Sequence, residues 1–107
     1  MANIGKLMKQ AQEMQAKMAK LQEELAHKEV EASSGGGMVT VKMNGQQEVL
    51  AINIDPEVFK EGDKEMLEDL VVAAVNEARR QSLDLAKEEM SKLTGGMPAT
   101  RTTRFAE

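Results

Sequence analysis

Lysines in the first twenty residues are the side chains whose spacing most clearly predicts a chemical role. Together with Glu13 they recur every three or four residues, so on a helix they share one face: Lys6, Lys9, Lys17 and Lys20. A row of ammonium groups on a helix can contact the phosphates of a nucleic acid. Arginines further along the chain could extend this surface: Arg79, Arg80, Arg101 and Arg104. The alternative interpretation is an ordinary solvated helix face, on which lysine is common.

Residues that could catalyse a reaction are scarce. His27 is the only histidine, and no nucleophile pattern accompanies it, so we expect a solvated or capping side chain. Carboxylates occur in runs close to lysines, as on a solvated helix face. The Gly35–Gly37 run lacks the lysine and hydroxyl residue of a phosphate loop and leads into a strand. With no cysteine either, the sequence predicts a non-enzymatic protein without metal or cofactor.

The lysine face belongs to a predicted helix with a heptad pattern. Its apolar residues alternate in steps of three and four: Ile4, Leu7, Ala11, Met14, Met18, Leu21 and Leu25. This narrow stripe predicts a helix over residues 4 to 25 that packs on another helix. An amphipathic helix lying on its own sheet is the alternative.

Alternation of apolar and polar residues predicts three short strands after this helix. They lie around residues 30–32, 39–43 and 48–54, with glycines 35–37 as a flexible connection. The Asn44-Gly45 pair marks an antiparallel hairpin between the last two strands.

The hairpin register follows from keeping one face apolar. A two-residue turn would place a glutamate on that face. We therefore expect a four-residue loop over 44–47, which pairs Val41 with Leu50 and Val39 with Ile52.

Two further helices complete the predicted α+β fold. Asp55-Pro56 starts a short helix that ends near Gly62, and Asp63 caps a long helix over 64 to about 93. The first half of the long helix is apolar over a wide arc, as for a helix on a sheet, and its second half narrows. We expect both long helices on one face of a three-stranded antiparallel sheet, which leaves the other face or an edge for a dimer contact. Residues 97–107 read as a disordered tail.

Composition favours a small cytosolic dimer. A chain of 107 residues with two aromatics and nine methionines makes one domain with a modest core, and a second subunit would add apolar burial. Neither a signal peptide nor a membrane span is apparent. The net charge is -4, but it divides into +3 over residues 1–20, -9 over 21–77 and +2 over 78–107. Basic ends around an acidic middle can mark a polyanion-binding surface.

The composition also indicates which kind of nucleic acid is favoured as a partner. Without tyrosine or tryptophan there is no aromatic platform for stacked bases, which favours phosphate contacts to double-stranded DNA with little sequence preference. The alternative function is a protein-interaction adaptor or chaperone-like dimer whose methionine-rich helix faces, including Met14 and Met18, bind other helices.

Four segments and their order closely resemble the YbaB/EbfC family of bacterial nucleoid-associated proteins. They are residues 7–15, the glycine run into 38–45, the Ile54-Asp55-Pro56 segment and residues 63–71. The resemblance covers residues 4 to about 97. It implies an α-β-β-β-α protomer, a homodimer whose sheets join across the interface, and long helices that project as arms. It also implies cytoplasmic, nucleoid-associated DNA binding that can alter DNA conformation and gene expression. We accordingly expect one DNA-binding and dimerisation domain over 1–97 and a tail over 98–107, with the DNA-contact residues resting on the charge pattern alone.

Overall fold

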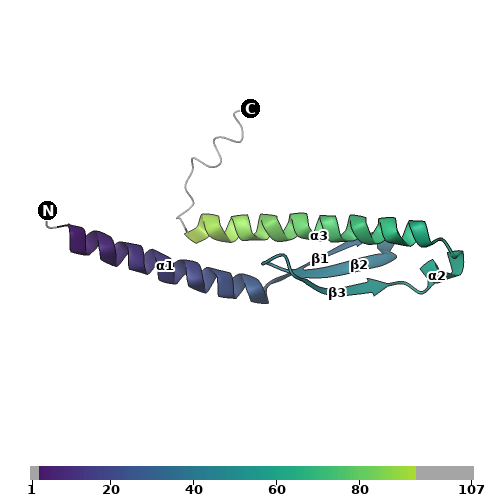
Figure 1. Ribbon diagram of the computed structural model, residues 1–107, viewed down its shortest axis with the longest axis horizontal. Coiled ribbons are helices and arrows are strands. Elements are labelled where there is room, and N and C mark those ends of the chain that lie inside the picture. Colours follow the sequence, from purple (N-terminus) through teal and green to yellow (C-terminus); the bar gives the residue numbers. More distant parts are fainter. Residues whose placement is uncertain (1–2, 94–107) are drawn as a thin grey trace, which may run out of the picture.

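The computed structural model describes residues 3–93, and these form an α+β fold in the predicted order (Figure 1). The elements are α1 (Ile4–His27), β1 (Glu29–Ser34), a short 3-10 turn η1 (Gly35–Gly37), β2 (Val39–Asn44), β3 (Val49–Ile54), α2 (Glu57–Glu61) and α3 (Lys64–Leu93). The expected helices and strands are therefore confirmed. The expected tail, with Arg101 and Arg104, lies outside the described residues.

The three strands form one antiparallel sheet in the order β1-β2-β3. The connection between β1 and β2 is η1, in which all three glycines have positive φ, at 61°, 68° and 98°. Glycine adopts this conformation without the steric cost that a side chain would add. The run expected to be a flexible connection is thus a tight turn that aligns Ala32 with Val41.

The predicted hairpin register is wrong by two residues. Val41 pairs with Ile52 and Val39 with Ile54, and a bulge places Val49 opposite Met43. Apolar alternation fixes only whether the offset is odd or even, so the expected face is kept while the offset changes. The side chain of Asn44 stabilises the loop over residues 45–48, because its Oδ1 atom accepts hydrogen bonds from the main-chain N–H groups of residues 46 and 48.

The core lies between α3 and the first two strands. Ala74 and Ala78 on α3 and Val39 and Val41 on β2 are fully buried, and Met43 is 2% exposed. Small residues one helical turn apart let the α3 backbone approach the sheet closely. Ser82 continues the same row and is also fully buried.

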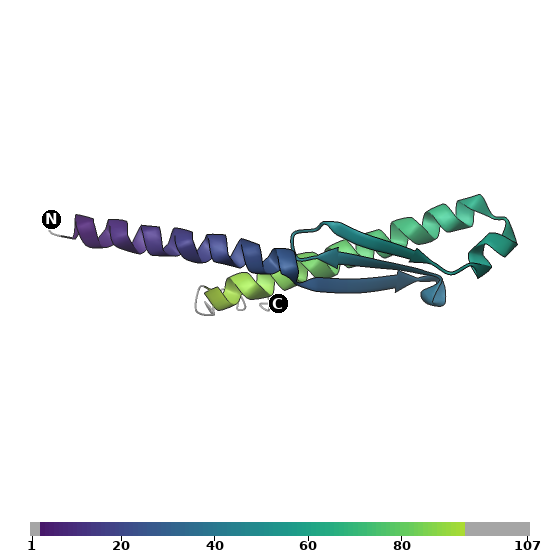
Figure 2. The same ribbon diagram turned by 90° about the horizontal axis from the view of Figure 1, so that it is seen from below.

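The expectation that both long helices cover one face of the sheet is wrong, because α3 alone covers it. Only the end of α1 contacts the body, through buried Leu21 and Leu25, while every residue from 3 to 17 is exposed. The chain passes from α1 to β1 through the single residue Lys28, whose backbone is extended. Such a short link does not allow the helix to fold back, so α1 points away from the strands along the long axis (Figure 2). The protein is accordingly elongated, at 72 × 34 × 16 Å.

Candidate nucleic-acid interface

The N-terminal part of α1 is a projecting arm, which we define as residues 4–17. Within residues 3–93 nothing covers its heptad stripe, and Ile4 and Leu7 are 66% and 61% exposed. Met18, Leu21 and Leu25 continue the stripe into the body, where they become half-buried or buried. The heptad pattern thus correctly predicted a helix, and three of the seven stripe residues pack within the same chain.

The four α1 lysines, Lys6, Lys9, Lys17 and Lys20, are all exposed, and none forms an ion pair with a described residue. Most other cations of residues 3–93 form ion pairs with acidic residues of this range: Lys28, Lys60, Lys64, Arg80 and Lys92. The remaining unpaired cations of residues 3–93 are Lys42, Arg79 and Lys87. Free positive charge is therefore concentrated on α1, although Glu13 on the same face reduces it.

The two neighbouring arginines of α3 differ in their charge environment. Two guanidinium nitrogens of Arg80 donate hydrogen bonds to the two carboxylate oxygens of Glu77. A third nitrogen lies 3.6 Å from an Asp84 oxygen. The hydrogen bond from Arg80 lowers the pKa of the Glu77 carboxyl, and the same bond raises the pKa of Arg80. Arg79 is exposed and forms no ion pair within residues 3–93. Only Arg79 of this pair offers an uncompensated charge.

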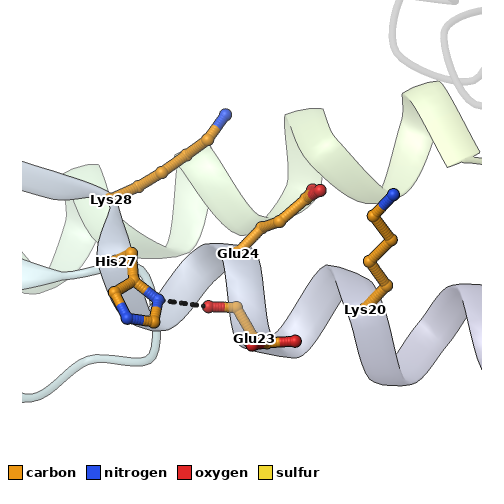
Figure 3. Close-up of a pocket in the computed structure, with 5 residues that line it drawn as sticks. All are labelled: Lys20, Glu23, Glu24, His27 and Lys28. Atoms are coloured by element: carbon orange, nitrogen blue, oxygen red, sulfur yellow. Dashed lines mark hydrogen bonds between the residues drawn. The ribbon is translucent and has the colours of Figure 1, made fainter.

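His27 lies in an open hollow of about 620 Å³ at the end of α1, lined by Lys20, Glu23, Glu24, His27 and Lys28 (Figure 3). Its Nδ1 atom lies 2.9 Å from the main-chain oxygen of Glu23, so Nδ1 carries the proton in this contact. His27 is also exposed, in agreement with the expected solvated or capping side chain. Figure 3 shows the ammonium groups of Lys20 and Lys28 on the same side as the Glu24 carboxylate.

A second hollow lies between α1 and the end of α3, and it brings in a lysine that the sequence analysis missed. Lys92 of α3 lines this space of about 250 Å³ together with Lys17 and Lys20 of α1. Its position could not be predicted locally, because it depends on α3 ending beside the middle of α1. Two acidic residues, Glu24 and Glu89, line the same hollow and offset part of its positive charge.

Glu89 connects the end of α3 to the start of the sheet. Its carboxylate accepts hydrogen bonds from Lys28 at 3.0 Å and Lys92 at 3.5 Å, and the side chain is only 11% exposed. The hydrogen bond from Lys28 is the main cause of a lowered Glu89 pKa. This contact helps to hold α3 alongside the α1–β1 junction.

The YbaB/EbfC DNA-binding family matches residues 1–97. The chain belongs to this family. It is 52% identical over 103 residues to a nucleoid-associated protein of Desulfotalea psychrophila, covering 96% of this chain and 97% of that protein. It is 55% identical over 95 residues to a nucleoid-associated protein of Clostridium novyi, covering 89% of this chain and 83% of that protein.

A solved structure has a similar fold. The chain is similar to the crystal structure of an uncharacterized protein from Helicobacter pylori, with a TM-score of 0.68 and 26% identity, covering 88% of this chain and 95% of that one. Family membership confirms the resemblance and the expectation of a DNA-binding protein rather than an enzyme. Within residues 3–93, no helix is long and apolar enough to cross a membrane.

Proposed function

We propose that this YbaB/EbfC protein is nucleoid-associated and binds double-stranded DNA as a homodimer, mainly through phosphate contacts made by the four α1 lysines. The observation that carries the proposal is their arrangement: they are exposed, without ion pairs in the described chain, and on one face of a helix that projects from the body. Neutralising phosphates releases counterions from DNA, so unpaired lysines contribute most. Arg79 and Lys92 extend the surface on α3, and we assign Arg80, Arg101 and Arg104 a supporting role.

The length of the lysine row suits contact with a duplex backbone. From Lys6 to Lys20 the helix rises about 21 Å at about 1.5 Å per residue. At about 3.4 Å per base pair, this length corresponds to roughly six base pairs. Lysine is a flexible point charge that contacts phosphates without reading base edges. We therefore assign binding with little sequence preference.

The edge strand β3 supports the homodimer. It pairs only with β2 among the described elements, so its outer edge has free backbone donors and acceptors. Val49, Leu50 and Ile52 are 45% to 47% exposed, because α3 covers β1 and β2 and leaves β3 open. Exposed apolar edge strands promote association with another chain. We assign this edge to contact a second copy, which joins the two sheets.

A dimer brings two lysine rows to one duplex. Contacts by two arms can deform the DNA when the spacing of the arms differs from that of the straight duplex. On this basis we propose an effect on DNA conformation and, through it, on gene expression.

The test is a salt titration of duplex binding with matched lysine variants. One variant carries Ala at Lys6, Lys9, Lys17 and Lys20, and its control carries Ala at Lys42, Lys60, Lys64 and Lys87, so both lose the same formal charge. We expect the first variant to lose affinity for all duplex sequences about equally. Its log-log salt slope should fall by about 0.9 for each phosphate contact removed.

Two results would contradict the proposal. Equal losses in the two variants would show that only net charge matters and not the α1 face. No binding of the wild-type protein to any duplex at low salt would exclude the function altogether. A light-scattering mass measured on the same samples tests the homodimer independently.

A further inference from the structure

The β2–β3 loop contacts the end of α1 at three places. The main-chain N–H of Gly45 donates to the Leu25 oxygen at 2.8 Å, and Asn44 Nδ2 donates to the Ala26 oxygen at 3.3 Å. Gln46 Nε2 donates to the Gln22 oxygen at 2.7 Å. The oxygens of residues 25 and 26 lie in the last turn of α1, where a helix leaves carbonyls without intrahelical donors. The loop therefore caps α1 from outside the helix.

The same loop is bonded to α3. Ser82 Oγ donates to the main-chain oxygen of Asn44 at 2.7 Å, and Gln47 Nε2 donates to Ser82 Oγ at 2.9 Å. Ser82 is fully buried, so this contact is shielded from water. Gln47 has a φ of 63°, a conformation that non-glycine residues adopt only at a cost. Its bonds to Ser82 and to the Gly45 oxygen stabilise that conformation.

Contact between the loop and α1 leaves no room at Gly45. A Cβ atom there would lie 2.8 Å from both Leu25 Cδ2 and the Leu25 main-chain oxygen. Because one of these atoms belongs to the helix backbone, a side chain cannot be accommodated by a rotamer change alone. The helix or the loop would have to shift.

We infer that residues 44–47 are a positioning element that sets the angle between α1 and α3, and thereby the spacing of the α1 lysines from the cations of α3. The inference rests on the proposed function for its effect on DNA. The effect of the loop on the helix angle depends only on its contacts. The loop is hydrogen-bonded to the end of α1 and to the buried middle of α3. Near its end, α3 also lines a hollow together with α1.

The length of α1 amplifies any change at this joint. Ile4 lies about 32 Å along the helix from Leu25, at about 1.5 Å per residue. A tilt of about 5° at the loop therefore moves the tip by about 3 Å. A displacement of this size is comparable to a hydrogen-bond length and changes which phosphates Lys6 and Lys9 can reach.

The test measures the distance between the helices directly. The sequence has no cysteine, so Met8→Cys and Glu88→Cys place one spin label on each helix at exposed positions. Labelled protein is diluted with unlabelled protein, so that each labelled protomer has an unlabelled neighbour in any oligomer. The distance distribution and duplex affinity are then compared for wild type, Gly45→Ala and Gln46→Ala. Gln22→Ala is the matched control, because the bond at residue 22 uses only its main-chain oxygen.

We expect Gly45→Ala to shift the mean distance by about 3 Å and Gln46→Ala to broaden the distribution, while Gln22→Ala leaves it unchanged. Duplex affinity should fall on the order of threefold to tenfold in Gly45→Ala, as for the loss of about one phosphate contact per protomer. Should Gly45→Ala fail to fold, as judged by circular dichroism, the distance distribution of Gln46→Ala, at a half-buried residue, tests the inference instead. Unchanged distances in the folded variants would overturn the inference, as would a shifted distance with unchanged duplex affinity. A wild-type protein that binds no duplex would overturn the proposed function, and the distances alone would then decide whether the loop sets the angle.

Discussion

Ser82 on α3 donates a buried hydrogen bond of 2.7 Å to the main-chain oxygen of Asn44 at the end of β2. Ser82→Ala removes the donor and leaves that buried oxygen without this partner. The oxygen keeps the main-chain N–H of Gln47 as a donor at 3.2 Å. We therefore expect the free energy of unfolding to fall by about 0.5–1.5 kcal/mol, the usual net contribution of a hydrogen bond. Urea unfolding at one fixed protein concentration measures the change, since the stability of the proposed dimer depends on concentration.

The matched control for this prediction is Ser33→Ala on β1. Ser33 is exposed, so its replacement should change the free energy of unfolding by no more than about 0.5 kcal/mol. Equal effects of the two substitutions would show that the bond between Ser82 and Asn44 contributes nothing specific.

Local patterns predicted the elements of this fold, and non-local contacts decided what the patterns left open. Alternation fixed the face on which Ile52 lies, but the hairpin offset also depends on a bulge beside Met43 and on the loop to which the Asn44 side chain is bonded. The heptad stripe predicted α1 as a helix. Its direction depends on the single extended residue Lys28, which no periodicity reveals.

The candidate site was likewise predicted only in part. The lysine face of α1 follows from spacing alone and was predicted. The ion pairs of Arg80 were not predicted, although Glu77 and Asp84 lie three and four residues away on the same helix face. Lys92 was not predictable, since its proximity to Lys17 requires knowing where α3 ends relative to α1.

Because α3 packs closely on the sheet, a larger side chain at Ala78 should lower the stability of the fold. Ala78→Leu inserts three carbon atoms into a fully buried position between α3 and the sheet. We expect a loss of about 1–3 kcal/mol from overpacking, measured by urea unfolding. Ala73→Leu is the control, because Ala73 is exposed on the same helix. A stable Ala78→Leu variant would mean that the interface between α3 and the sheet is loosely packed.

The dimer proposal predicts that charge on β3 separates the protomers. Ile52→Lys places an ammonium group in the apolar surface that we assign to the partner, where burial without a counter-charge is costly. The light-scattering mass should fall to that of one chain at micromolar concentration. Met8→Lys adds the same charge on the α1 arm and should leave the mass unchanged. A dimeric Ile52→Lys protein would place the interface elsewhere.

The Glu89 contacts predict a pH dependence of stability on the acid side. Because the folded-state pKa of Glu89 lies below its ordinary value of 4.5, the ionised form stabilises the fold above that value. This contribution is lost as the pH falls through the lowered pKa. The melting temperature of wild type should therefore exceed that of Glu89→Gln at pH 7. The difference should begin to shrink near pH 4.5 and disappear once the pH is below the lowered pKa. Glu88→Gln, at an exposed residue without an ion pair in the described chain, should show no such difference at either pH.

The charge environments of Arg79 and Arg80 predict unequal contributions to duplex binding. Arg79 forms no ion pair within residues 3–93, whereas Arg80 is held by Glu77 and Asp84 on its own helix. A phosphate that contacts Arg80 must compete with both carboxylates, so less counterion release results. We expect Arg79→Ala to reduce the log-log salt slope by about 0.9 per contact and Arg80→Ala to change it by clearly less. Salt titrations of the two variants on one random duplex make the comparison at equal net charge. A larger effect of Arg80→Ala would show that its ion pairs open on binding and that the DNA contacts the Arg80 side of α3.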